Sequence, residues 1–491
     1  MIKARWPLIC TLLIFLCTLA AASAPVDIPD FAARLGGPHW FIVSLRGQQT
    51  GYLKWSSHLR DTPEGQRLEI REHVRISFSV NSRHLQLQST QTAFYDENLQ
   101  PTRIEFFQNQ MGRVTETTVD ITDTDLRVTT RDPSGTHTET IARPDTLGSE
   151  LMVFRDALEE NIDKNWTRTF TTFDPFVNHL DTFEASYVGT EEADCGQLTH
   201  LEFVTEELNV TSHVWLGPDG MIFRQKMPAL LGAEFVRSTR DEALAEITGA
   251  SFQNTIPAGE PPENPHQADD VQLRVSTVAG SVADIIPDTA LQDVEETEDG
   301  ARVTVRPQDA PVQTVSIPVT DEAFSEYLQA NEIAQCEDEQ IRSLAREIVG
   351  DETDAWACAK MLLNWVHRNL RQVESEPRPV SALEILQQGQ GDCSEYAILY
   401  SALAQSIGIP TRLVLGLVYM DSGYAYHAWN EVYVGEWVQM DPSWKLYTRG
   451  AGHLQLASGP VSRDAMIKNN IATARTIGTL FLEFVPRQVD R

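Results

Sequence analysis

The chain of 491 residues contains 39 Lys and Arg against 70 Asp and Glu, which gives a formal net charge of −31 at pH 7. A surface this acidic repels polyanions, so nucleic acids and anionic membrane surfaces are excluded as expected partners. Hydrophobic residues make up 42% of the chain, enough for sizeable cores, and the length predicts two or three domains. The acidic residues lack the spacing of an EF-hand calcium loop and therefore indicate a solvated surface.

The N-terminal segment has the pattern of an export signal. Lys3 and Arg5 precede an apolar run from Trp6 to Leu19, and the small residues from Ala20 to Ala24 follow it. This order predicts a signal peptide over residues 1–24 and a mature chain that is periplasmic or extracellular. An uncleaved N-terminal membrane anchor is the alternative. No later segment has the roughly 20 apolar residues that a membrane span needs.

Residues 25–250 are predicted to form a β-rich N-terminal domain. Segments such as Leu68–Phe78 and Leu85–Phe94 alternate apolar and polar residues, and turns rich in Asp, Gly, Pro and Asn separate them. The segment Gly148–Glu159 is the helix expected there. The sequence of this domain contains no catalytic constellation, and its role is left open between substrate presentation, partner binding and support for folding.

A linker and a small β segment are expected before the last domain. Residues 251–270 are rich in proline, which predicts the linker, and residues 271–320 are expected to form the small β segment. The C-terminal domain is then assigned to residues 321–491. Its first two predicted helices, Glu337–Val349 and a second from Ala359 to Leu370, each have one apolar face and are expected to pack around a third helix.

The stretch Gly391–Trp444 carries the candidate chemistry and begins with that third helix. Asp392 with Glu395 three residues later is a capping box, so the helix is expected to begin at Cys393. Nearly every residue from Ala397 to Ile407 is apolar, which predicts a helix surrounded by protein. Unpaired backbone N–H groups at a helix start create a positive field, so the pKa of the Cys393 thiol is expected to be lowered.

Two adjacent strands are predicted after this helix. Leu413–Tyr419 is an apolar run suited to a buried strand, and Tyr424–Val434 alternates with the period of a strand, with His427 on one of its faces. Gly435-Glu436 is a candidate two-residue hairpin loop that leads into a returning strand from Trp437 to Met440.

The predicted hairpin also indicates how near Asp441 comes to His427. A two-residue loop places Asn430 opposite Asp441, and a strand rise of about 3.3 Å per residue then puts Asp441 within about 10 Å of the His427 backbone. The carboxylate reaches the His427 ring if the register slips toward His427 or if the end of the strand curls.

Cys393, His427 and Asp441 are the residue types that thiol catalysis needs. In such a site a histidine takes the thiol proton, while a carboxylate fixes the tautomer of the ring and stabilises the imidazolium. Each residue alone is more often structural, since a cysteine that opens an apolar helix is commonly a small buried residue and a strand histidine is commonly a satisfied one. The ordered set of three favours catalysis.

Three sequence boxes in this stretch resemble the transglutaminase-like superfamily of papain-type cysteine enzymes. They are Gly391 to Cys393 (GDC), His427 to Val432 (HAWNEV) and Trp437 to Pro442 (WVQMDP). The resemblance implies an α+β fold, a papain/transglutaminase-like core with a central catalytic helix packed on an antiparallel sheet, preceded by the β-rich N-terminal domain. It also implies that Cys393 is the nucleophile, His427 the general base and then acid, and Asp441 the orienting carboxylate.

Three functions remain open for such a chain. A cysteine protease or amidase, in which water resolves the acyl-thioenzyme, is favoured because water is always present outside the cytoplasm. A transamidase that cross-links proteins through an amine acceptor uses the same triad, and a non-catalytic binding or scaffold protein could retain the fold. A peptide or protein is the expected substrate, and the oligomeric state is open.

No cofactor and no metal are expected. A zinc site at Cys393, His427 and Asp441 is the rival interpretation, but no second Cys or His stands at ligand spacing beside them in the sequence. The donor that would stabilise an oxyanion is left open between the Cys393 backbone N–H and the side chains of the glutamines at 387, 388 and 390.

Overall fold

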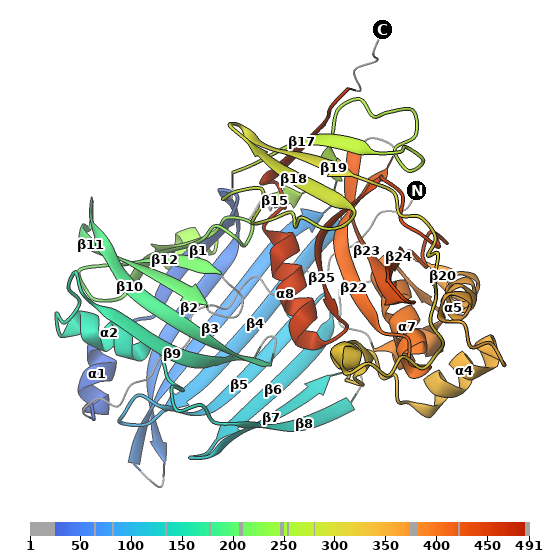
Figure 1. Ribbon diagram of the computed structural model, residues 1–491. Helices are drawn as coiled ribbons and strands as arrows, with labels where there is room; N and C mark the ends of the chain where they lie inside the picture. The colour runs from blue at the N-terminus through green and yellow to red at the C-terminus, as the bar shows by residue number, and fades with distance from the viewer. Residues whose placement is uncertain are drawn as a thin grey trace. The chain divides into compact units, whose positions relative to one another are not determined.

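The structure is a computed structural model, drawn in Figure 1, and it describes most of the chain. The described residues are 25–62, 65–80, 83–132, 135–175, 178–205, 210–245, 250–252, 255–278, 280–373, 381–420 and 423–486. They fall into two compact units, with the boundary after Phe252. The signal peptide predicted over residues 1–24 lies outside the described residues. None of the described helices is long and apolar enough to cross a membrane.

The first unit is built on a fifteen-stranded sheet of described residues. Its strands follow in the order β8-β7-β6-β5-β4-β3-β2-β1-β14-β13-β12-β11-β10-β9, with antiparallel neighbours, and β15 pairs parallel with β3. The strands are β1 (His39–Leu45), β2 (Gln48–Thr62), β3 (Gly65–Val80), β4 (Arg83–Tyr95), β5 (Pro101–Gln110), β6 (Arg113–Ile121), β7 (Asp125–Asp132), β8 (Gly135–Ala142), β9 (Thr167–Asp174), β10 (His179–Ala193), β11 (Gly196–Thr205), β12 (Thr211–Leu216), β13 (Ile222–Met227), β14 (Ala233–Ser238) and β15 (Ala250–Phe252). The β-rich N-terminal region predicted from the alternating segments is confirmed.

Three short helices accompany this sheet: α1 (Ile28–Leu35), α2 (Leu151–Leu158) and α3 (Arg240–Ala243). The second lies inside the segment predicted to be helical. The other two, α1 and α3, were not expected from the sequence. Their starts are nevertheless marked by side-chain caps, from Asp27 for α1 and from Thr239 for α3.

Two carboxyl groups are buried in the core of the first unit. The period of two places Glu72 on the same face of β3 as the buried Ile70 and Val74, and Glu150 stands just before α2. Burial raises the pKa of both groups, to about 8 for Glu150, and the charge of Glu150 raises that of Glu72 further. Neither carboxyl has a hydrogen-bond partner among the described residues, so both are better tolerated protonated.

The second unit contains three sheets in its described part. Their strand orders are β16-β23-β22-β25 with β24 beside β23, then β18-β19-β17-β26, and the parallel pair β20-β21. The strands are β16 (Thr255–Pro257), β17 (Val271–Thr277), β18 (Gln292–Thr297), β19 (Gly300–Val305), β20 (Arg371–Gln372), β21 (Gln390–Gly391), β22 (Thr411–Met420), β23 (Gly423–Tyr433), β24 (Trp437–Met440), β25 (His453–Pro460) and β26 (Leu480–Phe484). The segment predicted as a linker thus contributes β16, an edge strand paired with the start of β23.

The helices of the second unit pack around α7. They are the 3₁₀ helix η1 (Glu322–Leu328), α4 (Glu339–Val349), α5 (Ala355–Asn369), α6 (Ala382–Gln388), α7 (Cys393–Ser406) and α8 (Arg463–Ala474). Figure 1 shows α7 between the strands β22 and β23 and the helices α4 and α5, and it also contacts α6. Its residues from Tyr396 to Gln405 are all buried, which confirms the prediction of a helix surrounded by protein.

The ends of α7 follow the sequence signals. Asp392 caps its start, with the reciprocal bond from Glu395, and the chain leaves the helix through Gly408, whose φ of 81° is in the left-handed region that favours glycine. The helix is tied to the sheet by Asn430 of β23, whose amide donates to the Ala397 carbonyl oxygen at 3.0 Å and to Ser401 Oγ at 2.8 Å. The chain as a whole is mostly β, and its longer helices lie in the second unit.

The buried acids predict how the stability of the first unit depends on pH. The pKa values of both carboxyl groups are raised in the folded state, so their effect on the stability of the unit depends on pH. The stability is fully present below about pH 4.5, where both groups are protonated. It is lost as the pH rises toward 8, because the folded unit must then bury a charge. Glu150→Gln removes a charge that folding must otherwise bury. We expect its melting temperature at pH 8 to exceed that of the wild type by several degrees, since one kcal/mol corresponds to about 2–4 °C in a domain of this size.

Differential scanning calorimetry of the full chain between pH 5 and pH 8 checks this expectation. The variant should show a flatter dependence of the melting temperature on pH than the wild type. Glu139→Gln, which removes an exposed carboxylate from β8, is the control for a change in net charge. Equal pH dependence in the wild type and Glu150→Gln would contradict the raised pKa.

Candidate active site

Cys393 is the first residue of α7 and is held in place by the capping box. Asp392 Oδ1 accepts from the Ser394 N–H at 2.9 Å, and Glu395 Oε2 accepts from the Asp392 N–H at 2.8 Å. Gly391 is needed because a Cβ at that position would lie 2.3 Å from the Cβ of Glu395. The sequence therefore fixes the backbone on both sides of the thiol.

The Cys393 thiol is buried, with 3% of the residue exposed. Burial raises its pKa well above the usual thiol value, and the charges of Asp392, Asp441 and Glu395 raise it further, while the backbone amide of Ala428 lowers it. The expectation of a lowered pKa, drawn from the helix start, is wrong for this structure. The cost of burying a thiolate near three carboxylates exceeds what one helix terminus and one amide contribute.

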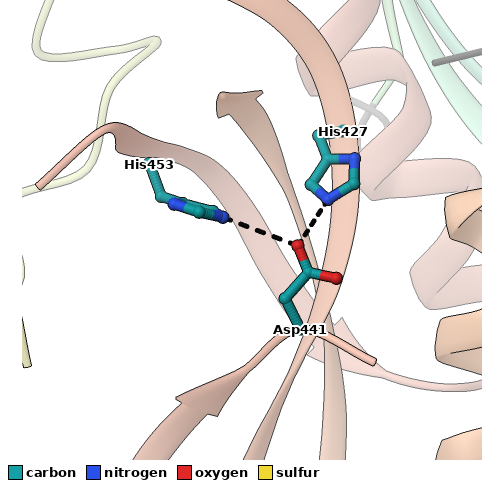
Figure 2. Close-up of side chains that lie close together, drawn as sticks. All are labelled: His427, Asp441 and His453. Atoms are coloured by element: carbon teal, nitrogen blue, oxygen red, sulfur yellow. Dashed lines mark hydrogen bonds and ion pairs between the residues drawn. The ribbon is translucent and has the colours of Figure 1, made fainter. Parts of the chain in front are cut away.

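His427 and Asp441 form a buried hydrogen-bonded pair. The distance from His427 Nε2 to Asp441 Oδ2 is 2.6 Å, and Figure 2 shows this contact. Both side chains are almost fully buried. His427 lies in β23, and Asp441 directly follows β24. The two residues that sequence reasoning paired are thus in contact.

This contact depends on a register that differs from the predicted one. Asn430 pairs with Met440 and not with Asp441, because the hairpin loop contains Val434 as well as Gly435 and Glu436. The Val434 carbonyl oxygen accepts from the Val315 N–H, a partner distant in sequence, so Val434 does not pair across the hairpin. This shift of one residue moves Asp441 toward His427. Contact between the two side chains was expected to need a shift in this direction.

Asp441 is fixed by donors on its other oxygen. Oδ1 accepts from the Ser443 N–H at 2.9 Å, from Ser443 Oγ at 2.7 Å and from the Trp444 N–H at 3.0 Å. Burial alone would raise the pKa of Asp441, but the charge and hydrogen bond of His427 outweigh it and hold the pKa well below its usual range. The carboxylate is therefore ionised at neutral pH, and His427 Nε2 is the donor in their bond.

With Nε2 as donor, the neutral His427 ring has its lone pair on Nδ1. This nitrogen is buried and has no hydrogen-bond partner among the described residues. No hydrogen bond joins it to the Cys393 thiol, although both residues belong to the described chain. The structure thus brings His427 and Asp441 together and places the thiol beside the backbone amide of Ala428, the next residue along β23.

His453 is a third member of this cluster that the sequence did not indicate. Its Nε2 lies 3.6 Å from Asp441 Oδ2, and Figure 2 shows its ring directed at the same carboxylate oxygen as that of His427. Burial lowers the pKa of His453 to about 4, despite the nearby Asp441 carboxylate that raises it. Sequence reasoning missed His453 because the sequence does not show that β25 pairs with β22, the neighbour of β23.

His266 also reaches the site, from the segment predicted as a linker. Its Nε2 is 2.9 Å from the Tyr419 carbonyl oxygen, and its ring stands 5.9 Å from that of His453 and 5.3 Å from that of Trp444. Gly452 permits this approach, since a Cβ there would lie 2.5 Å from His266 Nδ1. Sequence analysis missed His266 because it lies outside the stretch Gly391–Trp444 that carries the motifs.

The structure shows where each candidate oxyanion donor lies, and the choice among them stays open. Gln387 and Gln388 are exposed on α6, and the Gln390 side-chain oxygen accepts from Arg371. The Cys393 backbone N–H is at the start of α7, where helix geometry leaves such groups without an intrahelical partner.

Comparison with known families agrees with the motif analysis. Residues 342–442 match the family model of the transglutaminase-like superfamily, which confirms the resemblance seen in the three sequence boxes. The match covers α5, α6, α7, β22, β23 and β24, together with most of α4. A comparison with curated proteins finds no match.

Solved structures give weaker similarities. A candidate cysteine protease from Cytophaga hutchinsonii is 17% identical, with 44% of this chain and 81% of that one covered and a TM-score of 0.30. A beta-barrel-like protein of a domain of unknown function from Brucella abortus is 9% identical, with coverage of 41% and 94% and a TM-score of 0.30. A candidate protease from Parabacteroides distasonis is 10% identical, with coverage of 83% and 66% and a TM-score of 0.19. These TM-scores are too low to establish a shared fold.

The raised pKa of Cys393 predicts how its alkylation depends on pH. Iodoacetamide reacts with the thiolate, so labelling of Cys393 in the folded protein should increase with a midpoint above that of an ordinary thiol, about 8.5. Mass spectrometry of the peptide that contains Cys393 measures the rate at each pH. The same peptide in urea-unfolded protein is the control, and a folded-state midpoint well below the unfolded one would contradict the effect of burial.

Proposed function

Because residues 342–442 form a transglutaminase-like core, we propose that the chain is an exported thiol-dependent acyl-transfer enzyme, a cysteine protease or amidase that cleaves peptide or amide bonds. Cys393 is the nucleophile, His427 the general base and acid, and Asp441 the orienting carboxylate. The observation that carries the proposal is the buried 2.6 Å bond between His427 Nε2 and Asp441 Oδ2. Export rests on the segment 1–24, and the substrate is a peptide or protein.

The hydrogen bonds of Asp441 support the role of His427 as a base. Three donors fix Oδ1, so Oδ2 holds the His427 ring with Nε2 protonated and leaves Nδ1 to accept a proton. A base restrained in this way loses little entropy when the proton transfers. The ionised carboxylate also stabilises the imidazolium that forms.

In the reaction, the Cys393 thiol gives its proton to His427 Nδ1 while the sulfur attacks the carbonyl carbon of the substrate. The tetrahedral intermediate collapses when His427 returns that proton to the leaving amine, which breaks the C–N bond and leaves an acyl-thioenzyme. A water molecule then gives a proton to His427 and attacks the thioester. The acid leaves, and the proton returns to the sulfur.

The burial of the thiol requires movement before this reaction. Cys393 and His427 are 3% and 4% exposed, and no hydrogen bond joins the thiol to the ring in the described chain. Substrate must therefore open the site and bring the sulfur to Nδ1. A thiol that stays protonated until then is protected from oxidation and alkylation, which follow the thiolate.

The same observations favour a second candidate, a non-catalytic binding or scaffold protein. A buried thiol with a raised pKa and no bond to the neighbouring histidine is also what a purely structural cysteine shows. Transamidation is the further catalytic alternative, since an amine can replace water in the last step.

Substitutions at the site separate catalysis from a structural role. Cys393→Ala should reduce cleavage of a quenched peptide library to background, because no side chain then forms the thioester. Asp441→Asn should lower turnover by about 10²–10⁴-fold, since the ring loses its tautomer and its stabilising charge. The rate of release of the fluorescent product is the measurement.

Cys358→Ala is the matched control, because Cys358 is also a buried cysteine near a helix start, in α5. It should retain the wild-type rate on any peptide that the wild type cleaves. The enzyme assignment is wrong if Cys393→Ala and the wild type release product equally. Cleavage of no peptide, together with no labelling of Cys393 by an acylating probe, supports the scaffold.

The fate of the acyl group distinguishes hydrolase from transamidase. When a primary amine such as a dansylated cadaverine is added to a cleaved peptide, we expect the free acid to remain the main product, because water competes at a far higher concentration. Mass spectrometry of the products gives the ratio of acid to amide. A majority of the amide, with Cys393→Ala forming neither product, would assign the chain as a transamidase.

A further inference from the structure

His453 has no task in the proposed acyl transfer, yet it is buried at the centre of the site. Its Nε2 lies 3.6 Å from Asp441 Oδ2, beyond hydrogen-bond length, and neither of its ring nitrogens has a hydrogen-bond partner among the described residues. Burying a polar group without a hydrogen-bond partner is unfavourable, because the group loses its hydrogen bonds to water. A residue kept at this cost indicates a ligand that the ring would bind.

Three potential ligand atoms converge around Asp441. One ligand atom each of His427, Asp441 and His453 lies within 4.8 Å of the other two, and all three residues are buried. Figure 2 shows the two rings approaching the same carboxylate oxygen from different strands. Two imidazole nitrogens with one carboxylate oxygen form the donor set of open three-residue sites for zinc and related divalent ions.

The three ligands are also held rigidly. Both histidines stand on strands that pair with β22, His427 opposite Gly416 and His453 opposite Val418. The Asp441 carboxylate is fixed through Oδ1 by Ser443 and Trp444, so Oδ2 keeps a lone pair for a second partner. Carboxylates that ligate metals are commonly oriented by such additional hydrogen bonds.

The distances fit a small cation after minor adjustment. In a tetrahedral zinc site with bonds of about 2.0–2.1 Å, neighbouring ligand atoms are about 3.3–3.4 Å apart. The 2.6 Å separation between His427 and Asp441 would open, and the 3.6 Å separation between His453 and Asp441 would close slightly. Both changes are within the reach of side-chain rotations.

We propose that His427, Asp441 and His453 form a binding site for one Zn²⁺ or similar divalent transition-metal ion, and that this ion inhibits the chemistry of Cys393. The ion and the catalytic hydrogen bond need the same two atoms, His427 Nε2 and Asp441 Oδ2, so they exclude each other. Binding of the ion does not rest on the proposed function, whereas the inhibition does.

Direct binding tests the site on the full chain, in excess Mg²⁺ to suppress weak binding to surface carboxylates. Calorimetry with Zn²⁺ should give one tight site per chain, and Co²⁺ should give tetrahedral absorption bands without a thiolate-to-cobalt charge-transfer band. His453→Gln should weaken this site by about 100-fold or more, since it removes a ligand. Cys393→Ala should bind as the wild type does.

Controls separate this cluster from other histidines and from the thiol. His367→Gln alters a half-buried histidine of α5 outside the cluster and should leave binding unchanged. Equal affinity in His453→Gln and the wild type, or loss of binding in Cys393→Ala, would overturn the proposal. So would the lack of a stoichiometric site in the wild type.

If His453→Gln does not fold, measurements on the wild type alone test the proposed metal site. X-ray absorption of the zinc-loaded protein should then show two imidazole ligands, oxygen and no sulfur, and a sulfur ligand would overturn the site. The inhibitory effect is measured as the zinc-bound rate divided by the rate in EDTA for the same protein. If the protein binds zinc but shows no activity with or without zinc, the proposed metal site stands and the proposed enzyme function is rejected. If the protein is active and bound zinc does not change its rate, the proposed inhibition is rejected.

Discussion

The second unit depends on one buried carboxylate, that of Asp441. Three donors from the turn after it and the ring of His427 surround the group, and this shell allows a charge to exist in a core from which water is excluded. The strand that bears His427, the turn at Ser443 and the first residue of β25 all converge on it. Removal of the His427 ring would leave Oδ2 of this interior charge without its hydrogen-bond donor.

Burial and reactivity act in opposite directions at this site. The low dielectric strengthens the bond between Asp441 and His427, but it also stabilises the neutral thiol of Cys393. A helix start, which lowers a thiol pKa at an exposed position, is not sufficient when Asp392 and Glu395 of the same capping box add negative charge. The residues that build the helix terminus therefore partly cancel its electrostatic benefit.

Local signals predicted much of the fold, and contacts between distant segments produced the differences. The capping box at Asp392 and the alternation of β23 are read from neighbouring residues, and each agrees with the structure. The hairpin register was missed by one residue because Val315 binds Val434. His453 and His266 were missed because their places depend on which strands lie side by side, which no local pattern encodes.

The edge strand β16 has a consequence for any shortened form of the protein. Thr255 to Pro257 pairs with the first residues of β23, the strand that bears His427, and His266 follows nine residues later. A fragment that begins at residue 271, where composition alone suggests that folded structure resumes, would expose the backbone of β23 to other chains and empty the space beside Trp444. The second unit can therefore be isolated intact only if the cut precedes Thr255.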